Sequence, residues 1–137
     1  RQEQLSELNH RGLLDQHMVP VFKNTSKNFF SLPNELFFLN IGHGVITVYA
    51  YLLYCEDRRT HQCHPSYRTI SDVVHLTVST VMKHITKLAD RQFITVESTS
   101  YIDKRGMKWN GNNLYTILPI QMAMDYCYQQ QLLRLEA

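Results

Sequence analysis

Apolar residues recur at helical spacing in four stretches of the chain, and each stretch predicts a helix. These stretches are residues 44–55, 66–74, 78–91 and 120–135. The residues expected to share the apolar faces are Ile46, Tyr49, Ala50 and Leu53 in the first helix, Ile70, Val73 and Val74 in the second, Val78, Val81, Met82, Ile85, Leu88 and Ala89 in the third, and Met122, Tyr126, Gln129, Leu132 and Leu133 in the fourth. The fold is therefore expected to be mainly α.

Two shorter stretches, residues 93–97 and 113–117, combine β-branched residues with alternation and predict a pair of strands. Between them, residues 103–111 are rich in turn formers and carry several cations, and Pro119 follows the second strand. A small antiparallel β-hairpin with a basic tip is therefore expected.

The beginning of the chain has a weaker pattern. Its first part is polar with scattered leucines and is expected to form an arm. Residues 29–32 predict a short strand, and residues 33–37 predict a single helical turn that starts on proline. The predicted parts of the chain are an N-terminal arm over 1–27, one domain over 28–118 and a C-terminal helix within 119–137.

The junction between the second and third predicted helices has the residues of a tight turn. His75 falls where a positive φ is commonly needed, a conformation that glycine adopts more easily than histidine. Thr77 is placed to cap the third helix, with its hydroxyl accepting from the amide of Thr80. Two helices joined in this way and followed by a hairpin form a winged helix-turn-helix, whose usual ligand is duplex DNA.

In the helix predicted over 78–91, the face opposite the apolar residues is polar and cationic, with no acidic residue before Asp90. An ordinary solvent-exposed helix would mix glutamate with lysine, and such a face remains the alternative. The side chains expected to point outward are Ser79, Thr80, Lys83, His84, Thr86 and Lys87. The residues predicted to contact DNA are Ser66, Tyr67, Arg68, Val78, Ser79, Thr80, Lys83, His84, Lys87, Lys104, Arg105 and Lys108.

The distribution of charge agrees with this hypothesis. The 137 residues suit one domain, and the 14 basic and 12 acidic side chains nearly balance over the whole chain. Residues 58–108, however, hold nine basic and four acidic side chains, a net charge of +5. Contact with phosphates requires positive charge concentrated on the predicted DNA-binding region, although a solvated basic face would have the same composition.

Three sequence segments resemble a known family. They are CHPSYRTI at 63–70, LTVSTV at 76–81 and KLADRQFI at 87–94, and residues 29–37 and 48–53 add weaker similarity. Together they resemble the winged helix-turn-helix family of Firmicutes and their mobile elements, over roughly residues 28–118. His75 stands where that family usually has glycine, and Thr77 stands for its customary serine.

The resemblance implies sequence-specific binding of double-stranded DNA, with a transcriptional regulator as the expected function. Similar segments occur in replication initiators and replisome organisers of plasmids and phages, so replication initiation or plasmid maintenance is the alternative. A winged-helix scaffold that does not bind DNA is a further alternative, with Met107 and Trp109 as its contact surface. One winged helix covers few base pairs, so we expect a homodimer, with the C-terminal helix as the candidate interface.

Other chemistry is less well supported by the sequence. Cys55, His61, Cys63 and His64 lie near one another, but their spacing matches no standard zinc site, so no metal or cofactor is expected. The chain has no phosphate-binding glycine loop, nucleophile elbow or acid–base carboxylate pair, so an enzyme is not expected. An odd number of cysteines indicates a reducing cytoplasm, and no stretch is apolar for long enough to span a membrane.

Overall fold

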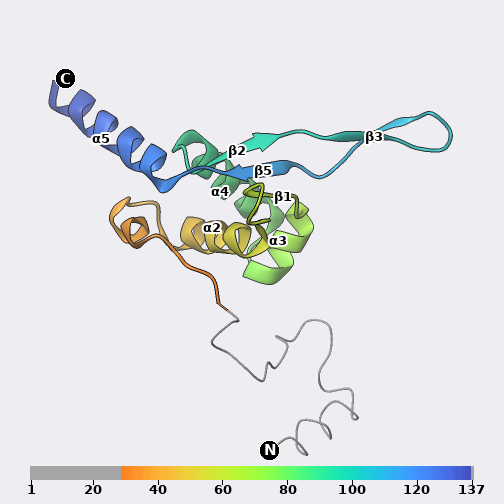
Figure 1. Cartoon of the computed structure of the whole chain (residues 1–137), viewed down its shortest axis with the longest axis horizontal. Helices are drawn as coiled ribbons and strands as arrows, with labels where there is room; N and C mark the ends of the chain where they lie inside the picture. Colours follow the sequence, from red (N-terminus) through yellow and green to blue (C-terminus); the bar gives the residue numbers. More distant parts are fainter. Residues whose placement is uncertain (1–28, 137) are drawn as a thin grey trace, which may run out of the picture. The chain divides into compact units, whose positions relative to one another are not determined.

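The computed structural model describes residues 29–136, and the predicted N-terminal arm over 1–27 lies outside them. Of these, residues 31–136 belong to one unit. Its elements, in chain order, are the 3-10 helix η2 (Asn34–Phe38), α2 (His43–Cys55), β1 (Gln62–Cys63), α3 (Tyr67–Val74), α4 (Val78–Asp90), β2 (Ile94–Glu97), β3 (Ser100–Ile102), β4 (Lys108–Asn110), β5 (Leu114–Ile117) and α5 (Ile120–Glu136) (Figure 1). The predicted winged helix-turn-helix, mainly α with a small antiparallel hairpin, is confirmed.

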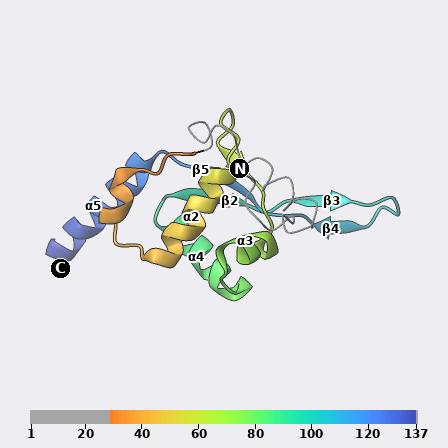
Figure 2. The same cartoon turned by 90° about the horizontal axis from the view of Figure 1, so that it is seen from below.

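Helices α2, α3 and α4 pack on one another, and α2 and α4 also contact the sheet (Figure 2). Their shared core is aliphatic, with Val48, Leu52, Ile70, Val81 and Leu88 fully buried. Tyr49 of α2 meets Phe93 edge to face, with ring centroids 5.3 Å apart, and so joins the helices to the start of β2. This core holds α4 in place from one side.

The sheet has three antiparallel strands in the order β1-β5-β2. The predicted pairing of β2 with β5 is confirmed, with Ile94 opposite Ile117 and Glu97 opposite Leu114. Strand β1 pairs with the other edge of β5 and lies in a segment, 58–64, that its polar composition predicts as a loop. A strand of two residues is too short to show alternation, so the sequence does not reveal it.

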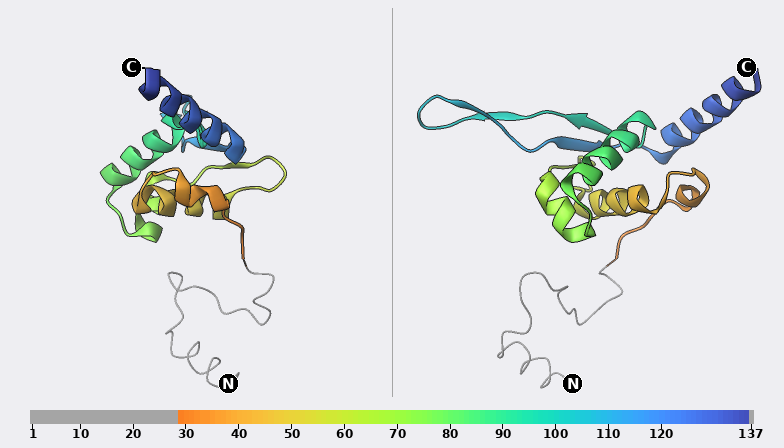
Figure 3. Two further views of the ribbon diagram at one scale, coloured as in Figure 1. Left: turned by 90° about the vertical axis from the view of Figure 1, so that its left-hand side faces the viewer. Right: turned by 180° about the vertical axis from the view of Figure 1, so that it is seen from behind.

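Beyond the sheet, β3 and β4 pair with each other and form the outer part of the wing, the hairpin from Ser100 to Asn110. The wing projects from the rest of the unit in Figure 1 and in the right-hand view of Figure 3. All residues of β3 and β4 are exposed, so the wing adds no side chain to the core.

Several predicted faces differ from those observed. In α2 the buried residues are Val45, Val48, Tyr49, Leu52 and Leu53, whereas Ile46 and Ala50 are partly exposed. Because α2 is apolar on nearly all sides, no polar face fixes the phase of its pattern.

The predicted burial of Val73 and Met82 is wrong, since these side chains are 50% and 46% exposed. In α3 and α4 the buried residues are only Ile70 and the row Val81, Ile85 and Leu88, so other apolar side chains of these helices remain exposed. The predicted strand at 29–32 is also wrong, because these residues have no regular structure and pair with no strand. The helical turn that follows is confirmed as η2, with Pro33 at its N-terminal cap.

Candidate nucleic-acid interface

The turn between α3 and α4 is fixed by local hydrogen bonds. His75 adopts the left-handed conformation predicted for it, with φ 58° and ψ 41°. The Ser71 carbonyl accepts from the amides of His75 and Leu76, and the Ser71 hydroxyl donates back to the Leu76 carbonyl. Thr77 caps α4 as predicted, because its hydroxyl oxygen accepts from the Thr80 amide at 3.3 Å. The direction of α4 is therefore set by its own first turn as well as by the core.

The outer face of α4 is defined here as Ser79, Met82, Lys83 and Thr86, all of which are exposed. Val81, Ile85 and Leu88 on the opposite side are buried. The Thr86 hydroxyl donates to the Met82 carbonyl at 3.0 Å, so it keeps its oxygen available to a ligand. Lys83 is the single cation on this face.

The prediction that His84 and Lys87 point outward is wrong. The Lys87 ammonium donates to the carbonyl of Ile41 at 3.0 Å, in the segment that leads into α2. The guanidinium of Arg91, just after α4, donates to the Leu39 carbonyl at 3.2 Å. These two cations therefore hold residues 39–41 against α4, and the interface is narrower than the sequence predicts.

His84 packs against the first turn of α2. A Cβ atom on Gly44 would lie only 2.6 Å from His84 Nε2, so glycine at this position allows the imidazole to approach. The pKa of His84 is lowered from its usual 6.5, first by burial and then by Lys87 and His43 nearby. The imidazole is therefore a neutral packing group at neutral pH.

Four of the residues predicted to contact DNA line one hollow of about 370 Å³. They are Ser66, Tyr67, Arg68 and Val78. Residues 111–113 of the chain leading back from the wing close its other side. The Ser66 hydroxyl caps α3 by accepting from the Thr69 amide at 3.0 Å. Arg68 lines this hollow and is exposed.

Tyr67 has a partner that the sequence does not reveal. Asn113 Nδ2 donates to the Tyr67 hydroxyl at 2.8 Å, and Asn112 Nδ2 donates to the His64 carbonyl at 3.2 Å. Two adjacent asparagines thus tie the start of α3 to the base of the wing. The wing and the helix-turn-helix are therefore held in a defined relation.

The turn between β3 and β4 lies well away from α4 (Figures 1 and 2). Three exposed cations lie in this turn or at the start of β4: Lys104, Arg105 and Lys108. The turn is ordered by Asp103, whose carboxylate accepts from the amides of Arg105 and Met107 at 2.9 and 3.0 Å. These three cations are brought together with one another but not with Lys83. A ligand long enough to contact both sites would meet Lys83 and these three cations at different places along its length.

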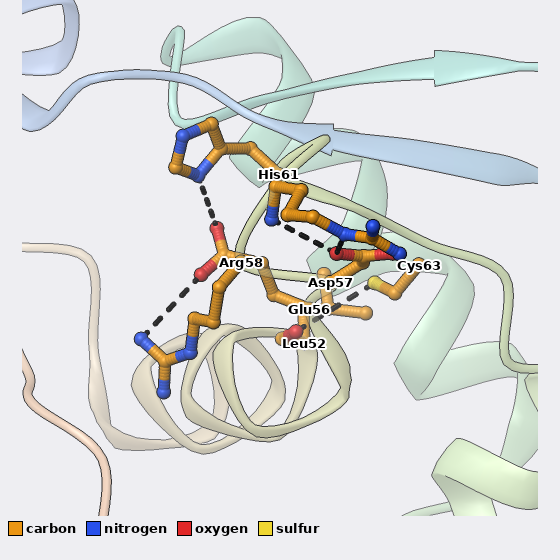
Figure 4. Close-up of polar contacts among 7 residues, drawn as sticks. Leu52, Glu56, Asp57, Arg58, His61 and Cys63 are labelled. Carbon is orange, nitrogen blue, oxygen red and sulfur yellow. Dashed lines mark hydrogen bonds and ion pairs between the residues drawn. The ribbon is translucent and has the colours of Figure 1, made fainter.

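A second polar cluster follows α2 (Figure 4). The side chain of Glu56 is only 7% exposed and pairs with His61 at 3.3 Å and Arg58 at 3.8 Å. The Cys63 thiol donates to the Leu52 carbonyl, and burial raises the pKa of this thiol to about 12. In the described part of the chain, no group of three or more histidine, cysteine or acidic side chains is close enough to hold a metal ion.

Within residues 29–136, no helix has the length and apolarity that crossing a membrane requires. All three cysteines, at positions 55, 63 and 127, are free thiols.

The order and pairing of these elements are those of a winged helix-turn-helix fold. Residues 39–94 match a family model described as a helix-turn-helix domain, which covers the chain from the end of η2 to the first residue of β2. A solved structure described as "possible transcriptional regulator from Methanosarcina mazei Go1" is 21% identical, with 72% of this chain and 76% of that chain covered and a TM-score of 0.47. No curated protein matches this chain.

Proposed function

We propose that this chain binds double-stranded DNA in a sequence-specific manner and acts as a transcriptional regulator. One observation carries the proposal: the outer face of α4 is exposed, mostly polar and free of acidic residues, with Met82 its one apolar side chain, while its inner face is buried. A B-DNA major groove admits one α-helix with such a face. The helix-turn-helix match over 39–94 supports DNA binding by the same residues.

In the proposed complex the start of α4 enters the major groove. Ser79 and Thr80 lie in its first turn, where short hydroxyl side chains approach base edges closely. Lys83, one turn further on, contacts the backbone of the groove. Arg68 contacts the flanking phosphate from the start of α3.

The wing supplies a second contact with the backbone. Lys104, Arg105 and Lys108 are exposed on it, and the excess positive charge of residues 58–108 spans both α4 and the wing. Neutralising phosphates releases counterions, so these residues provide affinity, whereas the outer face of α4 provides selectivity. On this proposal the protein has no catalytic role and works in the cytoplasm.

Affinity for duplex DNA measured over a salt series tests the proposal. If about six phosphates are contacted, the affinity falls about a thousandfold between about 50 and 200 mM salt. Lys83→Ala lowers the affinity and reduces the salt slope by about one, while Arg59→Ala, in the turn before β1, is the matched control and changes neither. Binding that is absent, or equally weak at all salt concentrations, would favour the scaffold alternative.

We also propose that the protein is a homodimer through α5. Ala123 is the one buried residue of this helix, whereas the apolar Tyr128, Leu132 and Leu133 are exposed towards its end. Apolar side chains gathered in this way are typical of an interaction surface. Sedimentation of the native chain should give a dimer, and Leu132→Glu with Leu133→Glu should give a monomer that keeps its helical content.

A further inference from the structure

One face of the wing carries an apolar strip that contact with a DNA backbone does not explain. Tyr101 of β3 lies directly opposite Trp109 of β4, so both side chains project from the same face of the hairpin. Met107 lies just before β4 and two residues from Trp109, so the alternation of an extended chain places it on this face as well. The three side chains are 56%, 50% and 54% exposed.

The indole of Trp109 is held in one orientation although it lies in solvent. Its Nε1 donates to the Asp103 carboxylate at 2.8 Å, the same carboxylate that orders the turn at the end of the wing. Gly106, at φ 82°, closes that turn with its amide donating to the Asp103 carbonyl at 3.0 Å. One edge of the ring is therefore bonded while half of the side chain remains exposed.

Cations lie next to this strip. Lys104 and Arg105 occupy the turn, and Lys108 lies opposite Ile102 on the other face of the hairpin. The one acidic side chain between Ser98 and Asn110, Asp103, is already occupied by three hydrogen bonds. The strip is thus apolar and contains two flat aromatic rings, with positive charge beside it.

We propose that Tyr101 and Trp109 stack on unpaired DNA bases next to the duplex bound by α4, so that the protein binds duplex–single-strand junctions. This inference rests on the proposed binding of duplex DNA. Paired bases present only their edges to a protein, whereas unpaired bases present their faces and stack on aromatic rings, with cations to neutralise the phosphates. A contact with intact duplex would use the three cations and leave the aromatic rings without a partner.

The single tryptophan of the chain allows a direct test, because tryptophan emission reports on position 109 alone. The native protein is titrated with a blunt duplex, with the same duplex bearing short unpaired thymidine tails, and with oligothymidine. We expect the tailed duplex to quench the emission and to bind about tenfold more tightly than the blunt duplex. Equal affinities together with unchanged emission would overturn the inference.

A pair of variants separates stacking from the support that an apolar side chain gives to the hairpin. Trp109→Phe keeps an aromatic ring, whereas Trp109→Leu keeps an apolar side chain that can still pack on the hairpin but cannot stack on a base. With labelled DNA, Trp109→Phe should retain most of the preference for the tailed duplex, and Trp109→Leu should lose it. Loss of the preference in both variants, or its retention in both, would contradict stacking by the ring.

Binding to the blunt duplex keeps this inference distinct from the proposed function. Neither variant should change that affinity by more than about twofold, since Lys83 and the wing cations are intact. If the blunt duplex binds and its salt slope is steep while tails have no effect, the proposed function stands and the junction is rejected, which leaves the strip to a protein partner. If no DNA binds at all, both proposals fail.

Discussion

Helix α4 and the wing both expose cations to solvent, but different forces hold them in place. Val81, Ile85 and Leu88 fix α4 through burial in the core. The wing has no buried residue in β3 or β4 and depends on its backbone pairing and on the hydrogen bonds of Asp103. Stability and recognition are therefore coupled in α4, whereas the wing can change its ligand contacts without altering the core.

The largest expected effect concerns stability. Leu88→Ala removes a fully buried side chain from α4 and should lower the free energy of unfolding by about 2–5 kcal/mol. Ile102→Ala on β3 is the matched control and should change it by less than about 0.5 kcal/mol, because that side chain is exposed. Denaturant unfolding followed by circular dichroism measures both, and similar losses in the two variants would remove the distinction between α4 and the wing.

A smaller effect separates the two lysines of α4. Lys87→Met removes the ammonium that donates to the Ile41 carbonyl and should cost about 1 kcal/mol of stability while leaving the salt slope of DNA binding unchanged. Lys83→Met should leave stability unchanged and reduce that slope by about one. If Lys87→Met reduced the slope instead, its side chain would leave the Ile41 carbonyl to bind DNA.

The smallest effect is confined to the wing and depends on pH. The pKa of Asp103 is lowered from 3.8, first by the hydrogen bond from Trp109 and then by the one from the Met107 amide. The ionised carboxylate therefore orders the turn of the wing above pH 3.8, and this order is lost as the pH falls through the lowered pKa. Trp109 emission should change in that acidic range while far-ultraviolet circular dichroism does not. Asp103→Asn should abolish the transition, and an unchanged transition would assign it to another group.

The helices, the main hairpin and the turn were predictable because they depend on local chemistry. His75 and Thr77 lie within a few residues of the groups that they bond, so their roles can be inferred from spacing alone. The pairing of β2 with β5 follows from two alternating segments joined by a turn-rich one. Local order of this kind is visible in any single sequence.

The remaining features depend on contacts between distant residues. Lys87 and Arg91 bond carbonyls that lie 46 and 52 positions earlier in the chain, and no periodicity distinguishes such cations from those that face solvent. The predicted buried face of α2 was wrong for a related reason. This helix is apolar all round, so the elements packed against it determine which side is buried. The predicted interface was therefore wider than the one the structure leaves exposed.

Photo-cross-linking reports which surface of the protein touches DNA. A photoreactive side chain is introduced in place of Ser79 on α4 or, as the matched control, in place of the exposed Gln129 on α5, and each protein is irradiated with bound duplex. If α4 enters the major groove, position 79 should cross-link efficiently to bases and position 129 should not cross-link at all. Cross-linking from position 129 with none from position 79 would contradict this placement of α4.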